Sequence, residues 1–320
     1  MMEKRKTLVL SFLLIPLLFF GCGKKQTAKE EVGEKKGREI VLGYSTPALN
    51  NTFWIRVTNG INEECNKRGV KVIVTDAQDN PNKQLSDVED LIQKKVDALL
   101  ISPYESDPIV PAVQSANRAN IPVIIVDIGT SGGEYASLII SDNIKGGKLA
   151  GEYMVKVLNG EGKVAHIQCQ LGAVNAQKRG QGFEEALKGT GVKVVAKRPA
   201  DSRRDLAMKV MEDILQRHPD LDGVFAQNDE MALGALQAIE AAGKLGKIKV
   251  IGFDGNKDAL EAIKAGKMLA TVAQLPEEMG KMAVDVALKV LKGEKVEKNI
   301  YVPVTLVTKE NVDEFLSKFK

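Results

Sequence analysis

Short runs of β-branched and aliphatic residues alternate with segments of helical periodicity from Glu39 onward. In the first helical segment, apolar residues recur three or four positions apart and therefore share one face of a helix. These residues are Trp54, Val57, Ile61 and Cys65. Strands that alternate with helices in this way predict βαβ units and parallel sheets.

The alternation restarts near Val164 and continues to the end of the chain. The predicted strands are Ile40–Thr46, Val70–Thr75, Ala98–Ile101, Pro122–Val126, Leu138–Ser141, Val164–Gln168, Val192–Ala196, Gly223–Ala226, Lys249–Gly252 and Ala270–Ala273, with two short strands last. The helices between them include Lys145–Leu158, Leu206–Gln216, Met231–Ala242, Ala259–Ala265 and Met279–Leu291. About a dozen strands are more readily accommodated in two sheets than in one. We therefore predict an α/β protein with two doubly wound parallel-sheet lobes.

Polar residues directly follow several of the apolar runs. In doubly wound sheets ligands bind outside the carboxyl ends of the strands, so these residues are candidate site residues. They are Ser45 with Asn51, Ser102, Asp127, Asn228 with Asp229, Asp254 and Gln274. An Asp or Ser at such a position can also simply cap the next helix. However, two adjacent residues cannot both be the N-cap, and glutamine is not a capping residue.

The chain gives no positive support for enzyme chemistry. None of its Gly-Lys pairs is followed by Ser or Thr, and no G-x-G-x-x-G occurs, so phosphate-binding loops are not predicted. Paired carboxylates at strand ends would suit a glycosidase, but they suit the binding of vicinal hydroxyls equally well. Cys65, Cys169, His166 and His218 show no metal or redox spacing. We expect buried cysteines, a helix-end His218, no metal and no cofactor.

Charge and composition narrow the class of partner. The chain has 320 residues, 44% of them hydrophobic and 27% charged, which is ordinary for a globular protein large enough for two lobes. The net charge of +3 is concentrated at the N-terminus: residues 1–21 carry +2 and residues 23–38 carry +3, which leaves −2 for the rest. A nearly neutral body argues against a nucleic-acid partner.

The N-terminus has the pattern of an export signal. A basic segment precedes the apolar run Thr7–Phe20, which is too short to span a bilayer of about 30 Å. We predict a signal peptide over residues 1–21, with an uncleaved anchor as the alternative. The Gly-Cys ending resembles a bacterial lipobox that would lipidate Cys22, although Phe19 replaces the usual small aliphatic residue. Residues 22–38 then form a solvated tether, at the outer face of the membrane or in the periplasm.

Several motifs together resemble the ribose-binding branch of the periplasmic sugar-binding proteins, which have the type I fold. They are Ser141–Asn143 (SDN), Arg179–Phe183 (RGQGF), Ala226–Ala235 (AQNDEMALGA), Gly252–Gly255 (GFDG), Ala273–Pro276 (AQLP) and Lys292–Val296 (KGEKV). The similarity runs in register from about Ile40 to about Thr308. It implies two lobes joined by a three-segment hinge: residues 39–141 plus 275–303, and residues 142–274 plus 304–320.

The resemblance also implies a ligand site between the lobes. Carried over by motif, the ligand-binding residues are Ser45, Asn51, Phe53, Trp54, Asp127, Arg179, Asn228, Phe253, Asp254 and Gln274. Gln177 is an alternative to Arg179, because the family often carries a second Arg at that position. Carboxylates accept hydroxyl hydrogens, a guanidinium donates in a planar fork, and aromatic rings offer flat apolar faces to a sugar. Trp54 can equally be a core residue of its own helix.

Three positions depart from the ribose-binding pattern. Ile128 replaces the Arg that follows the aspartate, Ser202 replaces an aromatic residue, and Gln177 replaces the second Arg. These changes remove a guanidinium and an aromatic face, which weakens the case for ribose itself. They would suit a different pentose, a deoxysugar, a hexose or a polyol.

The sequence therefore predicts a monomeric, exported protein that binds a monosaccharide and delivers it to the membrane subunits of an ABC importer. A receptor for a polyol or similar signal, acting on a chemoreceptor or sensor, is the alternative. The export signal argues against a transcription repressor of the same fold, and an exported hydrolase is the enzyme alternative. We also expect replacement of Arg179 by Ala to leave fold stability nearly unchanged, because its side chain would face the cleft rather than a core.

Overall fold

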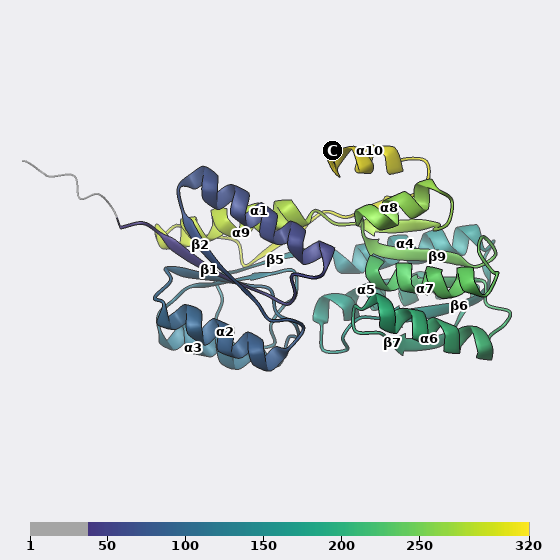
Figure 1. Cartoon of the computed structure of the whole chain (residues 1–320), viewed down its shortest axis with the longest axis horizontal. Helices are drawn as coiled ribbons and strands as arrows, with labels where there is room; N and C mark the ends of the chain where they lie inside the picture. The colour runs from purple at the N-terminus through teal and green to yellow at the C-terminus, as the bar shows by residue number, and fades with distance from the viewer. Residues whose placement is uncertain (1–37, 320) are drawn as a thin grey trace, which may run out of the picture. The chain divides into compact units, whose positions relative to one another are not determined.

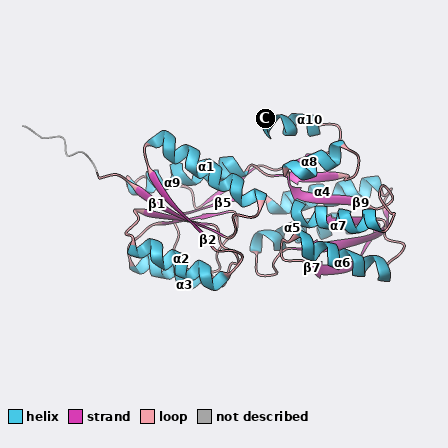
Figure 2. Cartoon of the chain, in the orientation of Figure 1, coloured by secondary structure: helices cyan, strands magenta, loops and turns pink. Residues whose placement is uncertain are grey.

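The computed structural model describes residues 38–319. The predicted signal peptide, Cys22 and the tether, apart from its last residue, lie outside the described residues. In the described part of the chain, two six-stranded sheets each carry helices on both faces (Figure 1, Figure 2). We call the sheet that begins with the first strand, together with its helices, the first lobe, and the other sheet with its helices the second lobe.

The first lobe is built on an all-parallel sheet in the order β11-β5-β4-β3-β1-β2. Its strands are β1 (Val41–Thr46), β2 (Lys71–Asp76), β3 (Ala98–Ile101), β4 (Val123–Val126), β5 (Ser137–Ser141) and β11 (Asn299–Val302). Figure 1 shows one pair of helices on each side of this sheet. The pairs are α1 (Thr52–Arg68) with α9 (Pro276–Leu291), and α2 (Pro81–Gln93) with α3 (Val110–Arg118).

The second lobe repeats this plan in the order β12-β10-β9-β8-β6-β7, and only the edge strand β12 is antiparallel. Its strands are β6 (Glu161–Gln168), β7 (Gly191–Pro199), β8 (Gly223–Ala226), β9 (Lys249–Asp254), β10 (Ala270–Ala273) and β12 (Thr305–Val307). Its helices pack in three pairs. They are α4 (Asn143–Val157) with α5 (Val174–Leu187), α6 (Arg204–Arg217) with α7 (Asp229–Ala241), and α8 (Lys257–Lys264) with α10 (Val312–Leu316).

The predicted α/β architecture of two parallel-sheet lobes is confirmed, and the predicted strands differ from the observed ones mainly at their ends. The largest differences are in β6 and β7, which run beyond the predicted apolar runs into polar residues at the edge of the sheet. The sequence predicts two short strands as the last elements of the chain. This prediction is wrong, because helix α10 follows these strands. With five residues, α10 is too short to display a helical period.

The chain passes between the two sheets three times. It crosses after β5, after β10, and between β11 and β12. Helix α4 packs on second-lobe strands, whereas α9 packs on first-lobe strands. The candidate site residues at the carboxyl ends of both sheets therefore lie on lobes that are joined by three connections in the described part of the chain.

The apolar core agrees with the sequence pattern. Trp54, Val57, Ile61 and Cys65 are all buried. Both cysteines of the described residues are free and buried, and His218 is the C-terminal cap of α6, as predicted. No helix between residues 38 and 319 is long and apolar enough to cross a membrane.

Glycines let helices α4 and α5 approach until their backbones touch. A Cβ atom at Gly147 would lie 2.0 Å from the Arg179 carbonyl oxygen, and one at Gly182 would lie 2.1 Å from the Ile144 carbonyl oxygen. Real side chains cannot occupy such positions without moving a helix. The position of Arg179 is therefore fixed in part by two glycines in the helix contact.

We expect Gly147→Ala to destabilise the protein by about 1–3 kcal/mol, because the methyl group overpacks this contact. Gly129→Ala is the matched control, since an added Cβ there comes no closer than 3.9 Å to Leu138. Urea unfolding of both variants is the measurement. Equal midpoints for Gly147→Ala and the parent protein would contradict the account of the contact.

Candidate functional site

Residues from the strand ends of both lobes line a common inner cavity of about 40 Å³. First-lobe residues come from the start of α1 and the loop after β4. Second-lobe residues come from α5, the end of β9 and the segments that follow β6, β7 and β8. The predicted site residues that line this inner cavity are Asn51, Phe53, Trp54, Asp127, Arg179, Asn228 and Asp254. We call the expectation that ligands bind at the carboxyl ends of the strands the strand-end rule. This rule and the family resemblance therefore select residues in the same part of the structure.

Arg179 lies at the centre of the site and is buried. Its Nε donates to Asn143 Oδ1 at 2.8 Å, and its Nη1 donates to the backbone oxygen of Gln227 at 2.9 Å. The guanidinium carbon lies over the ring of Phe253, 4.0 Å from the ring centre. A backbone oxygen, an amide and a ring face thus hold the side chain in one orientation.

Two buried carboxylates from opposite lobes flank this guanidinium. Asp254 Oδ1 lies 3.6 Å from Nη1, and Asp127 Oδ1 lies 4.0 Å from Nη2. Gln274 Nε2 donates to Asp254 Oδ1 at 2.7 Å, and Asn175 Nδ2 donates across the lobes to Asp127 Oδ2 at 2.8 Å. The positive charge of Arg179 is therefore shared by Asp127 and Asp254, and neither carboxylate makes a close ion pair with it.

Burial dominates the titration of both carboxylates. It raises the pKa of Asp127 to about 6 and the pKa of Asp254 to about 7, although the charge of Arg179 pulls both pKa values down. Asp127 Oδ1 and Gln274 Oε1 are buried acceptors without a hydrogen-bond partner in the described part of the chain. Unsatisfied buried acceptors are costly, and of these two residues Asp127 lines the inner cavity, so a ligand hydroxyl that donates to Asp127 Oδ1 would relieve that cost.

The backbone presents these two carboxylates in an unusual conformation. Asp127 has φ of 64° and Asp254 has φ of 122°, both in a region that residues other than glycine rarely adopt. Such strain persists only where the surroundings over-determine it, and it concentrates at functional sites. The backbone conformation is therefore a second, independent observation that singles out Asp127 and Asp254.

Aromatic side chains from α1 form one wall of the inner cavity. Asn51 is the N-cap of the helix and its Oδ1 accepts from the Phe53 amide at 2.9 Å. The rings of Phe53 and Trp54 meet edge to face, with centres 4.9 Å apart. Trp54 belongs to the buried core and also lines the cavity, so the two readings of this residue are compatible.

Four predicted ligand contacts do not line the inner cavity. Phe253 lies under the Arg179 guanidinium, and Gln274 reaches the site only through Asp254. Ser45 is buried in β1, where it accepts a hydrogen bond from Gln84. Phe253 and Gln274 therefore contact residues that line the cavity, whereas the hydrogen-bond partner of Ser45 does not line it.

Gln177 is the fourth of these residues, and it points away from Arg179 although both lie on α5. Its Nε2 donates to the Leu171 carbonyl at 2.7 Å, and the side chain lines a separate cavity beside Glu184. Of the two alternatives left open by the sequence, only Arg179 lines the inner cavity.

The adjacent residues Asn228 and Asp229 have different roles. Asn228 Oδ1 caps α7 by accepting from the Met231 amide at 2.9 Å, and this residue also lines the inner cavity. Asp229 is turned into the second lobe, where it accepts from Thr271 and from the Asn256 amide, both at 2.7 Å. Burial raises its pKa well above the usual value. Asp229 thus ties α7 to the loop after β9.

Two side chains that orient the site are not among the residues predicted from the sequence. Asn143 holds Arg179 and follows β5 inside the SDN motif, so the motif contained a signal that could have identified it. Asn175 reaches Asp127 from the first turn of α5, seven positions after the end of β6, and no strand-end rule reaches that far. Within residues 38–319 no group of three His, Cys, Asp or Glu side chains is placed to hold a metal ion.

Comparison with known proteins agrees with this geometry. The ribose import binding protein RbsB of Bacillus subtilis is 46% identical over 310 residues, which are 97% of this chain and 100% of that protein. The Escherichia coli ribose import binding protein RbsB is 45% identical and covers 85% of this chain and 90% of its own length. A Bacillus halodurans ABC transporter solute-binding protein solved with bound myo-inositol superposes with a TM-score of 0.83 at 35% identity, over 88% of this chain and 98% of that one.

The family profile described as the periplasmic binding protein domain matches residues 42–295, which include most strands of both sheets and the inner cavity between them. Together with the fold and the site, this match shows that the chain belongs to the periplasmic binding protein family.

Proposed function

We propose that this protein captures a sugar or polyol in the inner cavity and delivers it to the membrane subunits of an ABC importer. The observation that carries the proposal is the guanidinium of Arg179 between buried carboxylates of opposite lobes, with acceptors left unsatisfied. A small polyhydroxylated molecule has the matching chemistry, because its hydroxyls donate to carboxylates and accept from a guanidinium. Phe53 and Trp54 add an apolar face for the C–H side of a ring.

The names of the relatives support this class of ligand. Two are ribose import proteins, and a third was solved with myo-inositol. Ile128 and Ser202 both line the inner cavity, so the positions that depart from the ribose pattern lie where they can change specificity. We therefore propose a binding protein, not an enzyme, for ribose or a related sugar or polyol.

We further propose that the protein is exported and acts as a monomer, anchored by lipid at Cys22. In this proposal residues 39–141 with 275–303 move as one body and residues 142–274 with 304–320 move as the other. The three crossings between the sheets are the hinge. The Gly-Cys ending of the apolar run supports the lipid anchor.

A thermal-shift screen of pentoses, hexoses and polyols tests the proposed function. A ligand at about 100 times its Kd stabilises the folded state by roughly 2.7 kcal/mol, which such a screen detects readily. Stabilisation by at least one sugar or polyol is the expected result. Failure of every compound to shift the transition would overturn the proposal.

Ligand should also change the spacing of the lobes. An inner cavity of about 40 Å³ is far below the roughly 300–1,000 Å³ of typical ligand pockets, so the residues around it must move apart before a whole sugar ring fits. We expect the free protein to populate a wider form and the ligand to shift it toward the closed one. Solution scattering should show a smaller radius of gyration with ligand. Identical scattering with and without a stabilising sugar would count against a hinge.

Ile128→Arg should shift specificity toward ribose, because it returns the guanidinium that the ribose-binding pattern has after the aspartate. Ile128 lines both the inner cavity and the wider cavity next to it, so the longer side chain has room. Calorimetry against ribose and against the best ligand of the screen gives the affinity ratio. An unchanged ratio would contradict this account of the specificity.

A further inference from the structure

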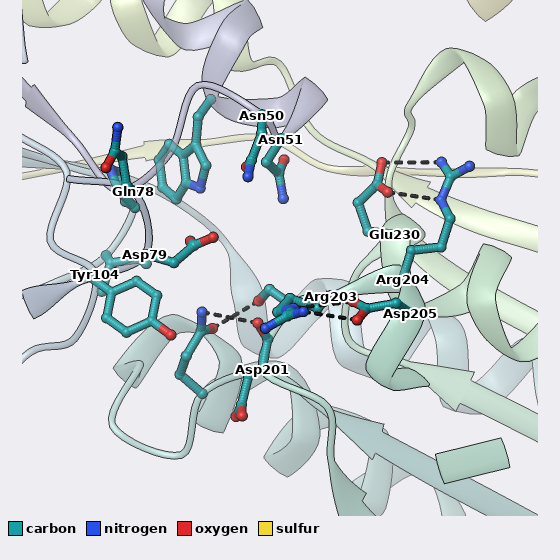
Figure 3. Close-up of a pocket in the computed structure, with 15 residues that line it drawn as sticks. Asn50, Asn51, Gln78, Asp79, Tyr104, Asp201, Arg203, Arg204, Asp205 and Glu230 are labelled. Atoms are coloured by element: carbon teal, nitrogen blue, oxygen red, sulfur yellow. Dashed lines mark hydrogen bonds and ion pairs between the residues drawn. The ribbon is translucent and has the colours of Figure 1, made fainter. Parts of the chain in front are cut away.

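A second, larger cavity opens directly from the inner one. This outer cavity has a volume of about 550 Å³ and is lined by both lobes (Figure 3). Asn51, Trp54, Ile128, Gln170 and Ser202 line both cavities, so the two spaces adjoin. The outer cavity falls within the range of roughly 300–1,000 Å³ that is usual for ligand pockets, and the inner one does not.

The outer cavity exists although the lobes already touch. The Ser106 amide of the first lobe donates to the Gly172 carbonyl at 3.1 Å, and the Val174 amide donates to Ser106 Oγ at 3.4 Å. The hydrogen bond from Asn175 to Asp127 is a further contact between the lobes. The outer cavity is therefore present while residues of the two lobes are already in hydrogen-bonded contact.

The junction between the two cavities is formed by a small side chain in a constrained loop. Ser202 has φ of 62°, and its Oγ donates to Gln170 Oε1 at 2.8 Å. The Gln170 amide in turn donates to the Asp201 carbonyl at 3.3 Å. These bonds fix Ser202 and Gln170 where the inner and the outer cavity adjoin.

The charges of the outer cavity disfavour an anionic occupant. Arg203 Nη2 lies 2.8 Å from Asp205, and Arg204 Nε lies 2.9 Å from Glu230, so both guanidinium groups are paired. The Asp79 carboxylate points into the space in Figure 3 and accepts no hydrogen bond from any residue of the described chain. It is half-buried, and burial raises its pKa.

The remaining lining suits a neutral, hydroxyl-rich group. Asn50 and Asn51 bring amides, and Tyr104 brings a hydroxyl, to the same space as the Asp79 carboxylate (Figure 3). Trp54 and Tyr104 also offer ring faces. The inner cavity, which we propose as the sugar site, has the same combination of acceptors, donors and aromatic faces.

We propose that the natural ligand is a glycoside: one sugar ring in the inner cavity, joined by a glycosidic bond to a second hydroxylated ring in the outer cavity. The inference rests on the proposed function, since the first ring takes the sugar site. It adds a subsite with Asp79, Asn50 and Tyr104 as its polar groups. No chemistry on the bond is implied, because the second ring is only bound.

Calorimetry on the full-length protein tests the inference with matched compounds. They are the free sugar that stabilises the protein most, its methyl glycoside, disaccharides that contain it, and its phosphate ester. Two new hydrogen bonds should make at least one disaccharide about tenfold tighter than the free sugar. The methyl glycoside should show little gain, and the phosphate ester should bind more weakly because it meets Asp79.

Two variants test whether the tighter binding of the disaccharide comes from the outer cavity. Asn50→Ala should remove an amide and Asp79→Ala should remove an acceptor, and both residues line the outer cavity but not the inner one. Each variant should therefore reduce the disaccharide advantage while the free sugar binds within about threefold of the parent. Asp213→Ala, an exposed carboxylate on α6 outside both cavities, is the control and should keep the full advantage. Free sugar binding as tightly as all its glycosides would overturn the inference and leave the proposed function intact. Absence of binding by any sugar or polyol would overturn the proposed function, and this inference with it.

Discussion

Replacement of Arg179 by alanine is expected to weaken sugar binding by about 2–5 kcal/mol, which is roughly thirty-fold to several-thousand-fold. The guanidinium lies within 4.0 Å of a carboxylate from each lobe. Its removal leaves ligand oxygens without a donor in a dry cleft and leaves two buried acids without their shared counter-charge. Calorimetry against the best ligand measures the loss.

The same substitution should also lower the stability of the ligand-free protein. The sequence alone suggested no effect, because Arg179 was expected to face the cleft rather than a core. In the structure the side chain is buried and fixed by Asn143, Gln227 and Phe253, so its removal breaks buried contacts of the second lobe as well. Urea unfolding of the free protein measures this second effect.

Gln177→Ala is the matched control for both experiments, since Gln177 lies on the same helix but lines a different cavity. It should bind sugar like the parent protein. Parental affinity for Arg179→Ala, or a large loss for Gln177→Ala, would contradict the proposed role of Arg179.

Ligand-free protein should lose stability as the pH rises from about 4 to about 8. The pKa values of Asp127 and Asp254 are raised by burial to about 6 and about 7, from an ordinary value of 3.8. In that window the folded state binds more protons than the unfolded state, so the free energy of unfolding falls with pH. The stabilising contribution is complete below the unfolded pKa and is lost as the pH passes the folded pKa. It is on the order of 3 kcal/mol for Asp127 and about 4 kcal/mol for Asp254.

Asp127→Asn and Asp254→Asn should therefore flatten the pH profile and stabilise the free protein near pH 8, while both weaken sugar binding. Urea unfolding at several pH values is the measurement. His166, whose pKa is lowered by burial, acts in the opposite sense, so each variant is compared with the parent at every pH. Asp213→Asn on the exposed face of α6 is the control. If both site variants show the same dependence of stability on pH as the parent protein, the slope does not come from these carboxylates.

The strand-end rule could predict much of the site because the fold places strand ends together. Asp127, Asn228, Asp254 and Gln274 were found from their positions after apolar runs, and each lines the inner cavity or contacts a residue that does. The rule also selected Asp229, whose side chain points into the lobe, because a strand end alone does not say which way a side chain turns. Helical phase was equally ambiguous for Gln177 and Arg179, which are separated by a single residue.

Other parts of the site depend on contacts between residues far apart in sequence. The hydrogen bond from Asn175 to Asp127 joins two lobes, and no local pattern predicts it. The motif suggested Phe253 as a ligand contact, and only the structure shows that the guanidinium of Arg179 lies over its ring. The outer cavity likewise needs the positions of both lobes. Sequence periodicity therefore predicted the sheets and the candidate acids, whereas their orientation required the structure.

A crystal structure of the protein with the sugar that stabilises it most tests the central claim most directly. The account predicts a ring in the inner cavity, with hydroxyls bonded to Asp127 of the first lobe and to Asp254 and Arg179 of the second. A sugar bound elsewhere, or held by one lobe only, would contradict it.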